Sequence, residues 1–491
     1  MIKKYLKEIL KHSFIYGIGE VVPSILAIFL IPLYTRFLTP GDYGILSVMT
    51  TYVYLLSLVF MQGQDVTLLR GYYDSKKVGN AGSLIKTLAI YIACVVIGVN
   101  CILLVAGFSY NFTFFAAVPF YPYGFIAMWI AAISVFLELF MLVVRLEGRP
   151  LHYIFYTIMQ FLLATGFIIL FVVFCGMRAD GSLLGRLIAG GIVAFFIIRY
   201  VKKYMRGRFD ARVLRSSLAF GLPSVPAKLG MRCLNIVDIF LLERLSNLSQ
   251  LGLYTLGYKY ATVLYIVVYA VRNVWTPAFY KSESEGTGKV VFPQLIRYYF
   301  IVLLGVAVVF SVFAREIIAL FTTDQYYESY KVVPYLLISF VCMGMYQVFS
   351  QSIVVKNKVY LLPVCSWSAL LVGVICHVFL IPRFGMMGAA YSSLIAFALL
   401  FILGVIFSQR LYPMRINWQM MFYALSCAVI CILVSGSIQG VSLMAAIMIK
   451  LSICLFYAVF VFCFSLDALE RRHGIDYIVN RFHVCFERYR K

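Results

Sequence analysis

About fourteen apolar segments, each long enough to cross a bilayer, follow one another along this chain with only short polar loops between them. Lipid offers the backbone no hydrogen-bond partners, so segments of this length are expected to form helices. The composition agrees, because 63% of the 491 residues are hydrophobic and 13% are charged, whereas soluble domains carry about 25% charged residues. The sequence predicts an all-α integral membrane protein, with its first span at Ser13–Leu33 and its seventh at Leu218–Leu242.

The formal net charge of +22 comes from Lys and Arg residues that gather in alternate loops. Examples are the loops at Lys76 and Lys77, at Arg145 and Arg149, and the basic stretch 199–215. By the positive-inside rule these loops are cytoplasmic, and so are both termini. Such loops suit anionic lipid headgroups, and nucleic acid is not an expected partner.

The chain lacks the motifs of the common catalytic and metal sites. Its twelve cysteines include no C-x-x-C pair, and its five histidines form no H-E-x-x-H. No G-x-x-x-x-G-K-[ST] loop is present to hold ATP. We therefore expect a protein that is not an enzyme and has no cofactor or metal. Any driving force would come from a gradient of H⁺ or Na⁺, the membrane potential or the substrate.

The stretch Phe220–Arg244 has spanning length but carries cations in its interior. At helical spacing Lys228, Arg232 and Asn235 share one face. A cation near the membrane midplane costs about 3 kcal/mol on insertion scales, so such residues usually face a bundle interior or a watery cavity. The sequence thus predicts a cationic, substrate-binding cavity, although pairing with nearby acids or snorkelling to the interface is the alternative for each cation. The candidate cations are Lys228, Arg232, Lys259 and Arg272.

Three acids, Glu20, Glu138 and Asp238, also lie in predicted spans. A carboxylate in a low-dielectric cavity can serve as a proton or sodium site unless a cation pairs with it. Glu138 precedes Arg145 on the same helix face, so an ion pair between them is the alternative there. All three are candidates for ion coupling, and Glu20 is favoured.

The two halves of the chain repeat one another, as in many transporters. In each half a glycine opens a helix that leads to an arginine, and a second glycine follows the arginine at the same spacing. The outer turn at 181–185 likewise corresponds to the one at 383–390. The residues that carry the repeat are Gly17, Arg36, Gly44, Gly221, Arg244, Gly252, Gly385 and Gly388.

This pattern predicts six parts. They are a basic interfacial N-terminus (1–12), an N-lobe of about six spans (13–201), a basic cytoplasmic linker (202–217), a C-lobe of about six spans (218–408), the last spans (409–466) and a basic amphipathic cytoplasmic tail (467–491).

FLIPLYTRFLTPGDYG near the start, the basic linker, and FLIPRFGMMGAAYSSL near the twelfth span resemble the polysaccharide biosynthesis (Wzx-type) flippases. These belong to the multidrug/oligosaccharidyl-lipid/polysaccharide (MOP) exporter superfamily. The resemblance covers essentially the whole chain. It implies two six-helix lobes in a V around a central cavity, with the last two helices outside.

The resemblance also implies a function. The cargo would be an undecaprenyl-diphosphate-linked oligosaccharide, moved by alternating access from the cytoplasmic to the periplasmic leaflet of the bacterial inner membrane. It would supply O-antigen, capsule or exopolysaccharide synthesis, beside a polymerase and a chain-length regulator. The alternatives are a peptidoglycan-precursor flippase, a drug/cation antiporter of the same superfamily and, more distantly, a membrane glycan polymerase or transferase. Clustered cations argue against an organic-cation cargo, because like charges repel.

Overall fold

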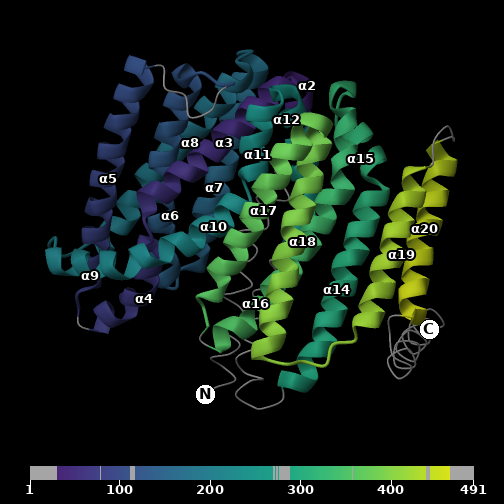
Figure 1. Ribbon diagram of the computed structural model, residues 1–491. Coiled ribbons are helices and arrows are strands. Elements are labelled where there is room, and N and C mark those ends of the chain that lie inside the picture. The colour runs from purple at the N-terminus through teal and green to yellow at the C-terminus, as the bar shows by residue number, and fades with distance from the viewer. Residues whose placement is uncertain are drawn as a thin grey trace, which may run out of the picture. The chain divides into compact units, whose positions relative to one another are not determined.

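A computed structural model describes residues 30–77, 79–110, 117–268, 271, 275, 288–356, 358–437 and 443–464, and these contain helices and no β-strand. The prediction of an all-α membrane protein is confirmed. The helices (Figure 1) are α2 (Ile31–Phe37), α3 (Pro40–Met61), α4 (Gln64–Lys77), α5 (Ala81–Tyr110), α6 (Phe125–Leu146), α7 (Pro150–Ile168), α8 (Arg178–Val201), α9 (Ala211–Gly221), α10 (Val225–Leu234), α11 (Val237–Leu245), α12 (Leu248–Ala261), α14 (Gly288–Val312), α15 (Ala314–Phe321), α16 (Val333–Val355), α17 (Leu361–Phe384), α18 (Met386–Leu411), α19 (Trp418–Gly436) and α20 (Leu443–Phe464).

Within the described ranges, twelve helical stretches are long and apolar enough to cross a membrane. Two of the predicted spans account for the difference from fourteen. The span predicted at 13–33 lies almost wholly before residue 30, outside the described residues, as do Gly17, the N-terminus 1–12 and the whole tail 467–491. The span predicted at 218–242 is present but broken.

The contacts between residues group the chain into two compact units. The first holds the described residues up to Tyr260, together with Ala319–Val332 and Val359–Leu399. The second holds the described parts of Ala261–Ile318, Val333–Lys358 and Leu400–Lys491. The two lobes predicted from the repeat, with their linker and boundaries, stay a prediction.

The stretch predicted as one continuous seventh helix is divided into α9, α10 and α11, so this prediction was wrong. A short 3₁₀ turn at Leu222–Ser224 separates α9 from α10. At the other end, the side-chain amide of Asn235 donates to the carbonyl of Met231 at 2.7 Å. Ile236 is then the N-cap of α11. An Asn side chain that bonds its own backbone competes with the helix. Lys228 and Arg232 share α10, whereas Asn235 lies at the break.

The turn from α2 to α3 and the turn from α11 to α12 share two features. Arg36 and Arg244 each lie in the last turn of the first helix, where the helix dipole favours a cation. Both arginines are exposed. In the turn that follows, Thr39 and Asn247 accept hydrogen bonds from backbone amides of the next helix, as N-cap residues do.

Two glycines let α3 and α12 approach each other closely. A Cβ on Gly44 would overlap the carbonyl of Leu248, and a Cβ on Gly252 would overlap the carbonyl of Pro40. The two contacts are reciprocal, because each glycine meets the residue that lies four positions before the other. Glycine is thus required twice by the same geometry.

The remaining repeat glycines also lie at close backbone approaches. Gly388 lies against the carbonyl of Leu380, and Gly221, at the end of α9, lies against α4 near Thr67. Gly385 ends α17 with φ +54°, a conformation that favours glycine.

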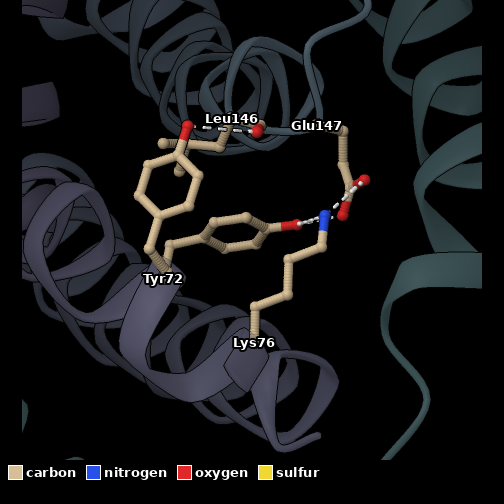
Figure 2. Close-up of polar contacts among 5 residues, drawn as sticks. Tyr72, Lys76, Leu146 and Glu147 are labelled. Carbon is tan, nitrogen blue, oxygen red and sulfur yellow. Dashed lines mark hydrogen bonds and ion pairs between the residues drawn. The ribbon is translucent and has the colours of Figure 1, made fainter. Parts of the chain in front are cut away.

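At the end of α3, left-handed residues turn the chain into α4. Gln62 has φ 44° and Gly63 has φ 77°, and α4 then lies beside α9 (Figure 1). Tyr72 donates to the carboxylate of Glu147, and Lys76 lies 3.0 Å from that carboxylate (Figure 2). Burial, and then the hydrogen bond to Glu147, raise the pKa of the Tyr72 phenol. These contacts fix α4 to the turn after α6.

The second unit contains a buried ion pair that the sequence analysis did not identify. In this unit α19 and α20 pack against α14. Lys450 of α20 is 2% exposed and lies 2.6 Å from the carboxylate of Glu316 on α15. A lysine in an otherwise apolar span needs such a partner.

We predict that Gly44→Ala will lower the free energy of unfolding by about 2 kcal/mol, because the added methyl group must push α3 away from the backbone at Leu248. Gly41→Ala is the matched control, since a Cβ there would meet only the Thr39 hydroxyl at 3.7 Å. Unfolding in mixed micelles measures both variants. If both variants lose the same free energy of unfolding, the close approach of α3 to the backbone at Leu248 is contradicted.

Candidate functional site

One face of α3 carries the polar residues Tyr43, Ser47, Thr50 and Tyr54. Their spacing of four, three and four residues places them on the same side of the helix. From Tyr43 to Tyr54 the helix rises about 16 Å, roughly half of a bilayer core. Tyr43 and Ser47 are buried, whereas Thr50 and Tyr54 are exposed. We call these four residues the α3 polar face.

Lys228 lies near the end of α3, where it pairs with an acid that the sequence analysis did not single out. Its ammonium is 2.5 Å from the carboxylate of Asp65, and the two side chains remain 30% and 23% exposed. Asp65 lies in the first turn of α4, where the helix dipole favours a carboxylate. Lys228 is therefore neutralised in part, in a place that water can reach.

Arg232 lies over the ring of Tyr54, with its guanidinium carbon 4.5 Å from the ring centre. A cation–π contact does not use the N–H groups in hydrogen bonds to oxygen. Within the described ranges those N–H groups have no hydrogen-bond partner. Tyr54 is 38% exposed, so the site is open.

Glu138 faces this site and not Arg145. Its carboxylate interacts electrostatically with Arg232, Asp65 and Lys228, and its side chain is exposed. Seven residues of helix separate Glu138 from Arg145 by about 10 Å, too far for an ion pair. Arg145 donates instead to the hydroxyl of Tyr153 at 2.8 Å. The predicted alternative of a Glu138–Arg145 pair is wrong.

Arg186 of α8 is a further cation at the α3 polar face. It donates to the hydroxyl of Thr50 at 3.1 Å, one turn of α3 away from Tyr54. The sequence analysis did not single out Arg186. An arginine eight residues inside an apolar span was the signal that could have found it.

Lys259 of α12 lies at the other end of this face, among tyrosine rings. Its ammonium is 4.7 Å from the ring centre of Tyr43 and 5.5 Å from that of Tyr34. One turn earlier on α12, Thr255 donates to Ser47 at 2.9 Å. Three helices, α8, α10 and α12, thus bring cations to one side of α3.

Asp238 lies in a separate buried network. It is 4% exposed, accepts from the hydroxyl of Tyr254 at 2.5 Å and bonds the amide of Ile239 at 2.8 Å. The hydroxyl of Ser393 lies 3.3 Å from that of Tyr254. The described residues provide this carboxylate with no ion-pair partner. Glu20 and Arg272, the remaining predicted site residues, lie outside the described residues.

The sequence profile of a family described as polysaccharide biosynthesis protein matches residues 33–331, more than half of the chain. The chain belongs to this family. The matched region contains the α3 polar face and every cation that contacts it. A comparison with curated proteins finds no match.

Solved structures share the fold at low sequence identity. The lipid II flippase MurJ, in an inward closed conformation, is 13% identical, with a TM-score of 0.72 over 92% of this chain and 98% of that one. An inward-facing multidrug MATE transporter of the MOP superfamily is 13% identical, with a TM-score of 0.61 over 80% and 97%. A mutant MATE transporter of Vibrio cholerae is 14% identical, with a TM-score of 0.58 over 82% and 96%.

The predicted MurJ- and MATE-like fold is confirmed, and so is the predicted membership of the polysaccharide biosynthesis family. The neighbours above are flippases and transporters, not enzymes.

We predict that Lys228 and Asp65 are energetically coupled. Lys228→Met and Asp65→Asn should each destabilise the protein, and the double variant should recover about 2 kcal/mol relative to the sum of the single losses, as expected for a hydrogen bond between charged groups. A double-mutant cycle of unfolding free energies measures this value. Additive losses would show that the pair does not form.

Proposed function

We propose that this protein moves undecaprenyl-diphosphate-linked oligosaccharides from the cytoplasmic to the periplasmic leaflet of the bacterial inner membrane by alternating access. The observation that carries the proposal is Arg232. Its guanidinium is oriented by Tyr54 in an open site, while its N–H edges have no hydrogen-bond partner among the described residues. Arginine offers a planar fork that matches phosphate oxygens.

The diphosphate is the part of such a cargo that hydrocarbon excludes. Lys228 and Arg232 provide cations for it, and Asp65 and Glu138 balance those cations when no cargo is bound. A phosphate that pairs with Lys228 leaves the Asp65 carboxylate without its cation, and the partial exposure of that carboxylate lets water solvate it. Lys259 and Arg272 are proposed to contact the cargo later on its path.

The proposed direction of transport is described relative to the orientation that the charged loops predict. Lys76 and Lys77, at the end of α4, belong to a basic set that the positive-inside rule assigns to the cytoplasm, with both termini. Lys228 then lies toward the cytoplasmic end of the α3 polar face, and Lys259 toward the periplasmic end. Basic loops on the cytoplasmic side would bind anionic lipids. A polymerase and a chain-length regulator would receive the glycan.

We also propose that transport is coupled to H⁺ or Na⁺. Asp238 supports this, because its buried carboxylate has hydroxyl neighbours and no ion-pair partner among the described residues. Such a group either holds a proton or binds a cation. Glu20 and Glu138 remain the other coupling candidates.

A peptidoglycan-precursor flippase is the second candidate function, favoured by the likeness to MurJ along 92% of the chain. In both candidate functions the cargo would be a lipid-linked diphosphate that uses the same cations. The two functions differ only in the glycan that the lipid carries. The drug/cation antiporter and the glycan polymerase or transferase are disfavoured, the former because cations at the site would repel its cargo.

We predict that Arg232→Gln reduces transport of lipid-linked glycan into vesicles at least about tenfold, the value of one charged hydrogen bond. Arg232→Lys should recover part of the activity, because it restores the charge without the fork. Arg215→Gln is the control, since Arg215 is an exposed residue of α9. Normal transport by Arg232→Gln would refute the phosphate-binding role. Supplying oligosaccharide-linked and peptidoglycan-type lipids in parallel decides between the two cargoes.

Asp238→Asn should make transport insensitive to an imposed gradient of H⁺ or Na⁺, because an amide neither ionises nor neutralises a cation. Glu20→Gln and Glu138→Gln test the other candidates in the same vesicles. The measurement is the ratio of transport rates with and without each gradient. If wild-type protein responds and all three variants respond equally, none of these acids couples transport.

A further inference from the structure

Beside the α3 polar face, four helices of the first unit surround a cavity of about 220 Å³. The helices are α3, α6, α7 and α8. At about 30 Å³ for each water, this volume would hold roughly seven water molecules. Most of the lining is apolar, but Ser134, Gln160 and Arg186 also line it. The cavity therefore combines one cation with a hydroxyl and an amide.

Arg186 has more donors than its protein contacts use. A guanidinium carries five N–H groups, and the described residues provide one hydrogen bond, to Thr50. No carboxylate of the described residues pairs with it. Arg186 lies about 12 Å along α8 from the start of that helix, within the span. A charge at this depth requires water or an anion beside it.

The position of Arg186 along α3 relates it to Arg232. Thr50, which Arg186 contacts, precedes Tyr54, which Arg232 contacts, by one turn or about 6 Å. Both contacted residues are exposed on one face of α3. Arg186 also interacts electrostatically with Lys259, farther along that face. An anion that leaves Arg232 in this direction meets Arg186 next.

We propose that Arg186, which is hydrogen-bonded to Thr50 and lines the same cavity as Ser134 and Gln160, is a second phosphoryl-binding site on the α3 polar face. The guanidinium binds phosphate oxygens, and the hydroxyl and the amide donate to the oxygens that it does not reach. The identity of the anion as a lipid diphosphate rests on the proposed function. The recognition of a phosphoryl group does not.

Binding to the purified full-length protein tests the proposal. Every protein compared, including the reference called wild type in the binding assay, carries Arg232→Gln, so that the first phosphate site does not contribute to the measured affinity. The probes are inorganic pyrophosphate and farnesyl diphosphate, a short isoprenoid diphosphate. Arg186→Gln should lower the affinity for each probe at least about tenfold, because it removes charged hydrogen bonds. Arg186→Lys should lower the affinity less than Arg186→Gln does, because lysine keeps the positive charge. Arg178→Gln, at the exposed start of the same helix, is the matched control and should bind like wild type.

Two further variants separate binding from folding. Gln160→Leu keeps the charge of Arg186 and removes one hydrogen-bond donor of the cavity. It should lower the affinity for pyrophosphate severalfold. If Arg186→Gln does not fold, Arg186→Lys and Gln160→Leu decide the matter, and unchanged affinity in both overturns the site. If Arg186→Gln lowers the affinity for farnesyl diphosphate but not for pyrophosphate, the phosphoryl site is also overturned. Arg186 would then recognise the isoprenoid chain and not the phosphoryl group.

The outcome is distinguishable from that of the proposed function. If wild-type vesicles fail to move lipid-linked glycan but Arg186→Gln loses pyrophosphate binding, the phosphoryl site stands and the cargo assignment fails. If wild-type vesicles transport the glycan and Arg186→Gln binds pyrophosphate like wild type, the second site is refuted and the function stands.

Discussion

A cation within a membrane must have a polar, anionic or aromatic partner, and this requirement determines how the first unit is built. Arg186, Arg232 and Lys259 come from three different helices, yet each meets a residue on the same side of α3. Helices α8, α10 and α12 therefore each place a cation against the α3 polar face. Electrostatic stabilisation and helix packing support each other here, because each contact that satisfies a charge also fixes a neighbouring helix.

Close backbone approach adds the second constraint. Gly44 and Gly252 leave room for α3 and α12 to touch through their main chains, as small residues do in membrane helix pairs. This proximity places Thr255 within hydrogen-bond distance of Ser47 and brings Lys259 among the tyrosine rings. A larger residue at either glycine would separate the helices that the cations need as neighbours.

Most of the fold could be predicted from the sequence, because hydrophobic length and the placement of Gly and Arg at turns are local signals. Lys228, Arg232 and Lys259 were found for the same reason, as cations inside apolar spans. Their partners were not. Asp65 and Tyr54 are unremarkable in sequence, and only the turn at Gln62 and Gly63 brings Asp65 to Lys228. The interruption at Asn235 depends on a side-chain hydrogen bond that competes with the helix, which hydropathy does not register.

That interruption has a mechanical consequence. Asn235 and Ile236 join α10 to α11, so the two short helices can change their mutual angle there, whereas an unbroken helix of the same length would move as one body. Asp238 of α11 accepts a buried hydrogen bond from Tyr254 of α12, whereas α10 carries Lys228 and Arg232. α10 is held to α17 as well, where the Trp367 indole donates to the carbonyl of Pro226 at 3.2 Å, so each of the two short helices has its own attachment. An anion that binds Arg232 contacts α10, and α10 takes no part in the close approach of α3 and α12, where Gly44 meets Leu248 and Gly252 meets Pro40.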